Sequence, residues 1–225
     1  MIAVGVDACP GGWVAVVVDE SGFRAAVAAP TIDGIAMRVP DADGFGVDIP
    51  IGLLPRGFRT ADQLARVEAG PRGRSVWMTP PRPVLEQESH AQATVVSVEL
   101  TGLGVSRQAH GLRRKILEVD DWLPDAAKPV WEVHPEISFA VLGGQRLPVP
   151  KDSWNGAAMR RRLLADAAGV SLPDALPEAG RARVDDVLDA AVVAWSCRRL
   201  LSGKGRCRPD PPQRGPDGRA IAIWS

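Results

Sequence analysis

The sequence predicts a mixed β-sheet with helices on its faces, which is an α/β or α+β fold by pattern alone. Three β-branched runs open the chain, a short apolar strand follows, and helical patterns dominate beyond residue 58. With 225 residues the chain is long enough for one such domain with a sizeable core. We therefore expect a single domain over residues 1–225.

The first strands are predicted from short apolar runs separated by turn signals. Residues 2–8 (IAVGVDA) and 13–19 (WVAVVVD) flank the turn CPGG, and 23–29 (FRAAVAA) follows a Ser-Gly turn. Three consecutive strands joined by such short loops form an antiparallel meander. The run GFGVDIPIG (44–52) is apolar on both sides of Asp48, which is typical of a buried parallel strand.

The remainder of the chain is predicted to be mainly helical. Helices are expected at 31–38, 60–70, near 85–100, near 106–118, at 135–142, near 154–168 and near 181–202. Two further strand candidates are PVWEVH (129–134) and AIAIW (220–224). The segment 205–219 is rich in Pro, Gly and Arg, which favours a loop.

The composition argues against several classes of protein. Lys and Arg number 27, as do Asp and Glu, so no global basic field indicates a nucleic-acid binder. Basic clusters at 71–74, 113–115 and 160–162 still allow a local basic face. The sequence shows neither a secretion signal nor the roughly 20 apolar residues of a membrane span, so we expect a cytoplasmic protein without membrane contact. The three cysteines lack the spacing of a zinc site.

Four carboxylates lie within apolar runs, where an ionised acid is destabilising unless it is paired or binds a metal. They are Asp7 in VGVDAC, Asp48 in GVDIPI, Glu132 in VWEVH and Asp189 in VLDAAVVAW. If the strands bearing Asp7 and Asp48 are parallel neighbours, their carboxylates lie about 5 Å apart. On a helix, Asp186 and Asp189 share one face and repel each other. A hard divalent cation, Mg²⁺ or Mn²⁺, would remove these penalties.

Structural explanations compete at several of these positions. A turn-capping role explains Asp7 as well as a functional one, whereas Asp48 precedes Ile-Pro, where turn capping is harder. Asp185 fits a helix N-terminal acid that interacts with the macrodipole. His134 in EVHPE, taken alone, is more often a hydrogen-bonded structural residue than a catalyst. No P-loop, dinucleotide-binding, zincin or α/β-hydrolase motif occurs.

Ordered sequence blocks run over nearly the whole chain. They are GVDACPGGWVAVVVD, VDIPIGL, TADQLAR with RGRSVW, GLGVSRQ, KILEVD, WEVHPEISF and VDDVLDAAVVAW. Together they resemble the domain of unknown function 429 family, which is regarded as a family of predicted nucleases. The resemblance implies a ribonuclease H-like mixed sheet with helices outside it. The first three strands would form an antiparallel meander, and the fourth and fifth would run parallel to the first.

The resemblance also implies a metal site. Asp7 and Asp48 would meet acids from the last long helix, where Asp186-Val-Leu-Asp189 matches the D-x-x-D spacing of ribonuclease H-like resolvases. Ribonucleases H proper carry a glutamate on the first helix, but the corresponding segment here offers only Asp33. The resolvase arrangement therefore fits this sequence better.

The EVHPE block is a further hallmark of the family. We expect Glu132 beside the site as a ligand and His134 as a group that transfers a proton or contacts phosphate. The predicted catalytic residues are Asp7, Asp48, Glu132, His134, Asp186 and Asp189. The predicted metal ligands are Asp7, Asp48, Asp186 and Asp189, with Glu132 as an alternative to Asp186.

These observations predict a metal-dependent nuclease that hydrolyses the phosphodiester bonds of DNA or RNA with two Mg²⁺ or Mn²⁺ ions about 4 Å apart. One ion would activate a water and the other would stabilise the leaving oxygen. The basic clusters at 113–115 and 160–162 are candidates for the phosphate path.

Two alternatives remain open. The sheet order is shared with actin-like ATP-dependent phosphotransferases, and DACPGG faintly resembles their phosphate-binding hairpin, although those enzymes usually need a second lobe. A non-catalytic nucleic-acid-binding protein, in which the acids hold a structural ion or stay protonated, is the other.

Overall fold

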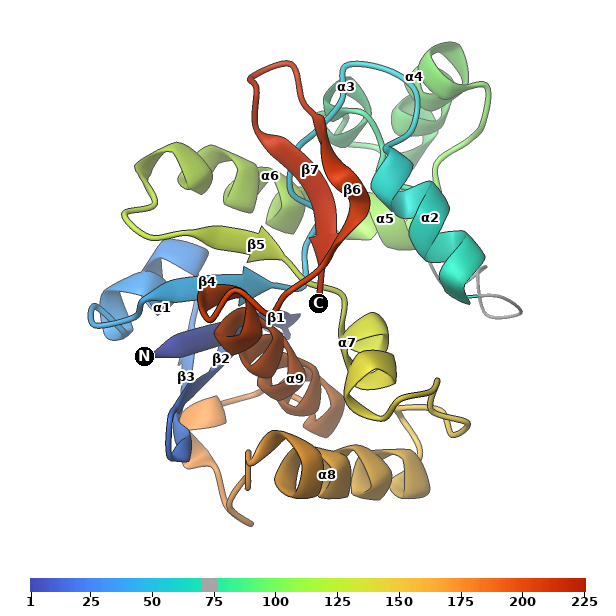
Figure 1. Cartoon of the computed structure of the whole chain (residues 1–225). Helices are drawn as coiled ribbons and strands as arrows, with labels where there is room; N and C mark the ends of the chain where they lie inside the picture. The colour runs from blue at the N-terminus through green and yellow to red at the C-terminus, as the bar shows by residue number, and fades with distance from the viewer. Residues whose placement is uncertain (70–76) are drawn as a thin grey trace. The chain divides into compact units, whose positions relative to one another are not determined.

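The computed structural model in Figure 1 describes residues 1–69 and 77–225. These residues form two compact units. The first comprises residues 1–49, 125–206 and 224–225, and the second comprises 50–124 and 207–223. The expectation of one domain over the whole chain stays a prediction. The basic cluster at 71–74 and the expected end of the 60–70 helix lie outside the described residues.

A five-stranded sheet organises the first unit. Its strands are β1 (Ala3–Cys9), β2 (Gly12–Asp19), β3 (Gly22–Ala29), β4 (Gly44–Val47) and β5 (Val130–Glu132), in the spatial order β3-β2-β1-β4-β5. β1 and β3 pair antiparallel with β2, β4 pairs parallel with β1, and β5 pairs parallel with β4. The mixed sheet expected for a ribonuclease H-like fold is confirmed.

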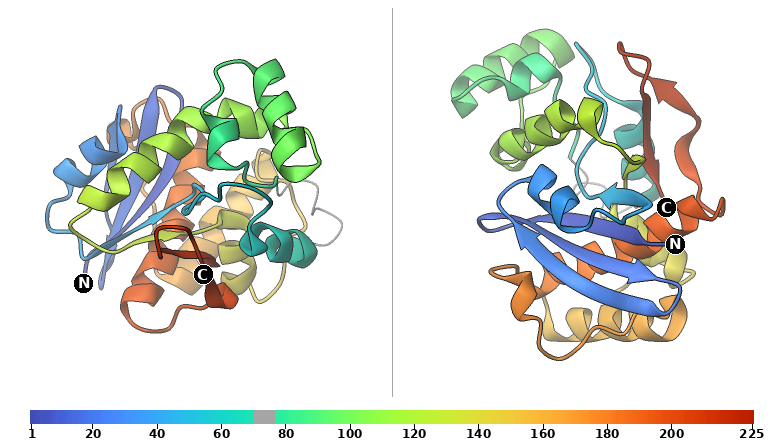
Figure 2. Two further views of the ribbon diagram at one scale, coloured as in Figure 1. Left: turned by 90° about the horizontal axis from the view of Figure 1, so that it is seen from above. Right: turned by 90° about the vertical axis from the view of Figure 1, so that its left-hand side faces the viewer.

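Helices cover both faces of this sheet. They are α1 (Ile32–Arg38), α7 (Pro135–Leu142), α8 (Trp154–Ala168) and α9 (Val184–Leu201), with the 3₁₀ turn η3 (Pro177–Ala179). Helix α9 packs on β1, β2 and β4, and α7 and α8 pack on α9. Figure 2 shows α1 and α8 on opposite sides of the sheet. The layers on the α9 side are therefore sheet, α9 and α8.

The backbone of α9 approaches the sheet closely because small residues face each other across the contact. A Cβ atom added at Gly5 would lie 2.1 Å from Ala190 O and 2.1 Å from Ala194 N, both backbone atoms. On the next strand, a Cβ at Gly46 would lie 2.9 Å from Val193 Cγ1. Glycines on two neighbouring strands thus form the surface on which α9 rests.

The second unit is mostly helical. Its elements are α2 (Thr60–Ala69), α3 (Arg82–Leu85), α4 (His90–Thr101), α5 (Arg107–Gly111), α6 (Arg113–Trp122) and the two-stranded sheet of β6 (Cys207–Arg214) and β7 (Ala220–Trp224), while the 3₁₀ turn η2 (Leu123–Asp125) follows α6. Arg59 and Asp62 form a buried ion pair. Arg59 also donates to Ile51 O at 3.0 Å, and Asp62 accepts from Thr79 N at 2.8 Å.

Two of the helices predicted for this unit are interrupted. The helix expected near 85–100 is divided into α3 and α4, because the hydroxyl of Ser89 caps α4 by accepting from Gln92 N at 3.2 Å. The helix expected near 106–118 is divided at Leu112 into α5 and α6. Apolar periodicity alone did not reveal these breaks.

The prediction of a loop at 205–219 is wrong for most of that segment. Residues Cys207–Arg214 form β6, which pairs with β7. A two-stranded sheet leaves one edge of each strand unpaired, and proline is tolerated where its missing N–H would not face the partner. Proline content therefore indicated a loop where the chain forms an edge strand.

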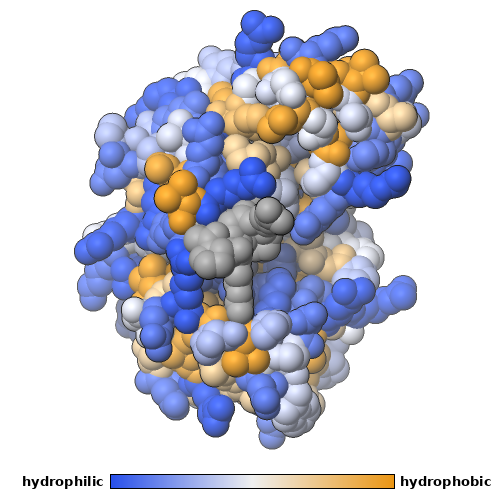
Figure 3. Space-filling model, turned by 90° about the vertical axis from the view of Figure 1, so that its right-hand side faces the viewer, coloured by the Kyte–Doolittle hydropathy of each residue, from blue (hydrophilic) through white to orange (hydrophobic). Residues whose placement is uncertain are grey.

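The surface of the second unit carries several apolar side chains. Val95 and Val98 on α4, and Leu103 beyond its end, are each more than half exposed. Figure 3 shows hydrophobic residues gathered in the upper part of the face it draws, among hydrophilic ones. Within the described ranges, no helix has the length and apolar character needed to cross a membrane.

The contact at Gly5 predicts a strong effect of a single methyl group. In Gly5→Ala the new Cβ would overlap the backbone of α9, which cannot yield as a side chain can, so we expect a loss of about 1–3 kcal/mol or more in the free energy of unfolding. Denaturant titration measures this loss. Gly111→Ala is the matched control, since a Cβ there meets no atom within 4 Å. Equal stabilities of the two variants would contradict the close approach.

Candidate metal centre

Asp7 and Asp48 meet because their strands are parallel neighbours. Val6 on β1 pairs with Val47 on β4, and Asp48 N donates to Val6 O at 2.9 Å, so the ladder continues one residue past β4. Asp7 and Asp48 are the next residues along the two strands and project from the same face of the sheet. This is the face that Gly5 presents to α9, because side chains alternate along a strand.

Asp189 joins them from α9. It lies in the second turn of the helix, one residue before Ala190, whose backbone lies close to Gly5. One carboxylate oxygen from each of Asp7, Asp48 and Asp189 lies within 4.8 Å of the other two. We call these three residues the acid triad. Three chain segments that are far apart in the sequence thus bring carboxylate oxygens to one point.

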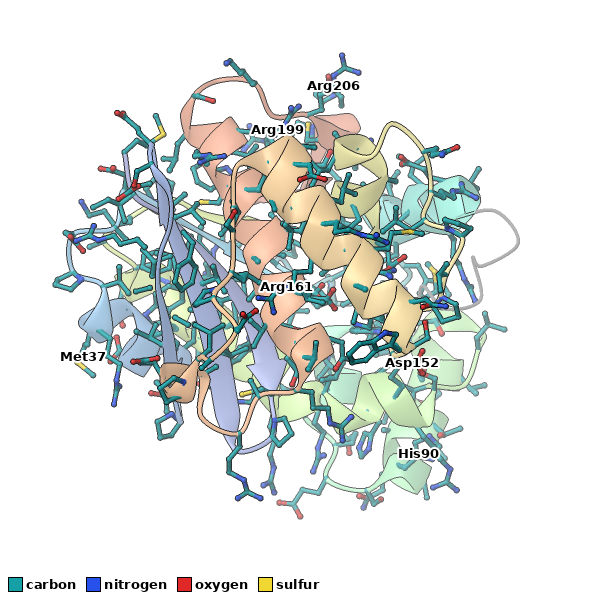
Figure 4. All side chains as sticks on the ribbon, turned by 90° about the horizontal axis from the view of Figure 1, so that it is seen from below. Met37, His90, Asp152, Arg161, Arg199 and Arg206 are labelled. Atoms are coloured by element: carbon teal, nitrogen blue, oxygen red, sulfur yellow. The ribbon has the colours of Figure 1, made fainter. Side chains whose placement is uncertain are left out.

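Lys151 is a member of this centre that the sequence did not reveal. It lies in the turn that precedes α8, next to Asp152, which is labelled in Figure 4, and its ammonium donates to Asp189 Oδ2. The Asp189 side chain has no exposed surface, whereas the Lys151 side chain is 43% exposed. A lysine in a polar turn carries no pattern that distinguishes it from an ordinary solvated one.

The second oxygen of Asp189 has no such partner. Asp189 Oδ1 is buried and accepts no hydrogen bond from any described residue. A buried carboxylate oxygen without a donor is destabilising, because it has lost its water without gaining a replacement. A metal ligand is left in this situation when the ion is absent.

Burial and mutual repulsion make the triad reluctant to ionise. Burial, followed by the charges of Asp48 and Asp189, raises the pKa of Asp7 well above its ordinary 3.8. Burial raises the pKa of Asp48 to about 7 and that of Asp189 to about 7, although Lys151 acts in the opposite direction on both. A divalent cation would favour the ionised forms by neutralising their charge.

Glu132 lies beside the triad rather than within it. In the pairing of β4 with β5, Glu132 lies opposite Val47, so strand alternation places its side chain on the other face from Asp48. It is buried, and after burial its charge is among the causes that raise the pKa of Asp48. Its role as a metal ligand stays a prediction.

His134 directly precedes α7 and has one nitrogen free for a ligand. Its buried Nδ1 finds no hydrogen-bond partner in the part of the chain that the structure describes. Burial lowers the pKa of His134 below its ordinary 6.5, although the charges of Asp189, Glu136 and Glu132 oppose the shift. A neutral imidazole can accept a proton or bind a metal through its free nitrogen.

Asp186 is occupied by the start of its own helix. Its carboxylate accepts from Arg183 N at 2.8 Å, which satisfies one of the unpaired donors at the start of α9. The charge of Asp186 nevertheless contributes to the raised pKa of Asp7, after burial and the charges of the triad. Its predicted role as a fourth ligand stays a prediction.

The predicted phosphate path through 160–162 is wrong at Arg160. This residue is only 1% exposed and donates to Glu136 at 2.5 Å and to Val149 O at 3.2 Å. Its guanidinium carbon lies 5.3 Å from the centre of the Phe139 ring. Arg161, labelled in Figure 4, donates to Asp174 at 2.6 Å. Arg160 thus joins α8 to α7 and is not available to a substrate.

Comparisons with known proteins place this chain in a family. A search of curated proteins found no match. Among solved structures, the chain is similar to one described as "Thermus thermophilus RuvC structure", with 12% sequence identity and a TM-score of 0.38, covering 91% of this chain and 98% of that one. A family model described as "Protein of unknown function (DUF429)" matches residues 5–214. Since this match spans most of the chain, the protein belongs to the DUF429 family, as its sequence blocks predicted.

Proposed function

We propose that this protein is a divalent-metal-dependent nuclease that hydrolyses phosphodiester bonds of a nucleic acid at the acid triad. The observation that carries the proposal is the convergence of Asp7, Asp48 and Asp189, whose oxygens lie within 4.8 Å of one another. Such a cluster is destabilising without a cation, so its presence in the core calls for a function.

The donor set fits Mg²⁺ or Mn²⁺. The triad offers only carboxylate oxygens, which hard divalent cations prefer, and Asp189 Oδ1 is a buried oxygen with no other partner among the described residues. When bound, the ion would polarise a phosphate group and lower the pKa of a water nucleophile. The function of the triad is to hold the ion and fix its position between β1, the end of β4 and α9.

The surrounding residues would handle protons and charge. The free Nδ1 of His134 is suited to accept a proton or contact the substrate, because burial lowers the pKa of the imidazole and so favours its neutral form. Asp186 and Glu132 add negative charge near the triad. The two-ion scheme expected from the sequence needs one of them as a further ligand, in addition to the three carboxylates.

Removal of a single triad oxygen tests the proposal. We expect Asp7→Asn and Asp48→Asn each to lower Mn²⁺-dependent cleavage by about a hundredfold or more, since several kcal/mol of charge stabilisation depend on the ion. The assay measures cleavage of single-stranded, duplex, hybrid and branched substrates. Asp166→Asn is the control, because Asp166 is an exposed residue of α8 outside the triad.

The same assay can refute the proposal. Absence of metal-dependent cleavage on every substrate would contradict the nuclease function, as would full activity in Asp7→Asn. Nucleic-acid binding without cleavage, equally strong in the native protein and in Asp48→Asn, would instead favour the non-catalytic binding protein.

The raised pKa values predict how stability depends on pH when divalent ions are removed. The pKa of Asp48 and of Asp189 is about 7 in the folded protein, against an ordinary 3.8. Their protonated forms therefore contribute stability that is fully present below pH 3.8 and is lost as pH rises through about 7. Thermal unfolding in the presence of a chelator should show this loss of stability. The Asp48→Asn variant should lose less stability over the same pH range.

Addition of Mn²⁺ should reverse the trend. Since the ion binds the ionised triad, the increase in Tm that it produces should be larger at about pH 8 than at about pH 5. An increase that is independent of pH, or that is equally large in Asp48→Asn, would show that Mn²⁺ binds elsewhere.

A further inference from the structure

Lys151 brings a permanent positive charge into the centre where two divalent ions were expected. Its ammonium donates to Asp189 Oδ2, so one of the two oxygens of this carboxylate already has a cation. Burial alone would lower the pKa of Lys151, but the charge of Asp189, followed by those of Asp48 and Asp7, raises it. The ammonium thus interacts with all three members of the triad.

The charges of the triad and Lys151 together are matched by one divalent ion. The ionised triad carries three negative charges, and the Lys151 ammonium reduces this to two. A single Mg²⁺ or Mn²⁺ brings the sum over these four residues and the ion to zero, whereas two such ions would leave an excess of two positive charges, which only acids outside the triad could offset.

The hydrogen bonds of Asp189 also favour a single ion. A second ion that shares Asp189 with the first would need its other oxygen, but Oδ2 is bound to Lys151 and only Oδ1 is without a partner among the described residues. The two acids that the sequence offers as a further ligand are poorly placed to supply one. Asp186 accepts from Arg183 N, and alternation along β5 places Glu132 on the other face of the sheet from Asp48.

We propose that Lys151 takes the place of the second divalent ion, so that the centre binds one Mg²⁺ or Mn²⁺ per chain. The inference rests on the metal centre of the proposed function but not on cleavage itself. An ammonium has three N–H donors, of which Asp189 engages one in this structure. With a side chain that is 43% exposed, Lys151 can present another donor to a phosphate oxygen of a nucleic acid.

The number of ions bound tests this inference without any substrate. Isothermal titration of the metal-free protein with Mn²⁺ should give one ion per chain. In Lys151→Met the position of the ammonium is vacated, so we expect two ions per chain, with the first bound about tenfold more tightly or better because a repelling charge is gone. Lys151→Arg keeps the charge and should bind one ion.

Lys128→Met is the matched control, because Lys128 is an exposed lysine of the same unit and should leave one ion bound. Two ions in the native protein, or one ion at unchanged affinity in Lys151→Met, would overturn the inference. If Lys151→Met does not fold, the number of Mn²⁺ ions bound by the native protein and by Lys151→Arg tests the inference, and two ions in either would overturn it.

The two proposals fail in different ways. One ion in the native protein and two in Lys151→Met, with no cleavage of any substrate, would refute the nuclease and leave the role of Lys151 standing. Metal-dependent cleavage by a native protein that binds two ions would refute the role of Lys151 and leave the nuclease standing. Binding of no Mn²⁺ by the native protein refutes both.

Discussion

The close contact between the backbone of α9 and the glycines of β1 and β4 controls the geometry of the first unit. Because Gly5 has no side chain, Ala190 and Ala194 can approach the strand, and Asp189 is carried to the level of Asp7. A larger residue at Gly5 would move the helix away from the sheet and Asp189 with it. The packing of the core and the assembly of the acid triad thus depend on the same contact.

This arrangement buries the three carboxylates of the triad, where water solvates their charges poorly. Burial raises the pKa of all three triad carboxylates, and the single ammonium of Lys151 offsets only part of their repulsion. The remaining negative charge is what would attract a cation to the proposed metal centre. In the proposed function, stability would be lower without a bound ion, and the free energy lost by burying the acids would be regained when the metal binds.

Much of the fold could be predicted because its signals are local. The turns CPGG and Ser-Gly fix the meander, and apolar residues on both sides of Asp48 mark a buried parallel strand. Local patterns failed where a single helix cap or an edge position in a sheet determines the secondary structure. Ser89 begins a new helix inside an apolar pattern, and the prolines of β6 lie in a two-stranded sheet that no composition rule identifies.

The candidate site was predictable to the extent that it depends on buried acids. Asp7, Asp48 and Asp189 stood out because a carboxylate in an apolar run needs a reason. The sequence alone does not give the register of β4 and β5. That register places Glu132 on the other face of the sheet from Asp48. Lys151 could not be predicted, because a lysine in a polar turn is ordinary in a sequence. Only the structure shows that it contacts Asp189.

The order of the triad along the chain has a consequence for biosynthesis. Asp7 and Asp48 are synthesised before the third carboxylate, which is 141 residues beyond Asp48 and belongs to α9. A nascent or truncated chain that ends before α9 holds at most two of the three carboxylates. Any chemistry that depends on the complete set is therefore withheld until α9 has been synthesised.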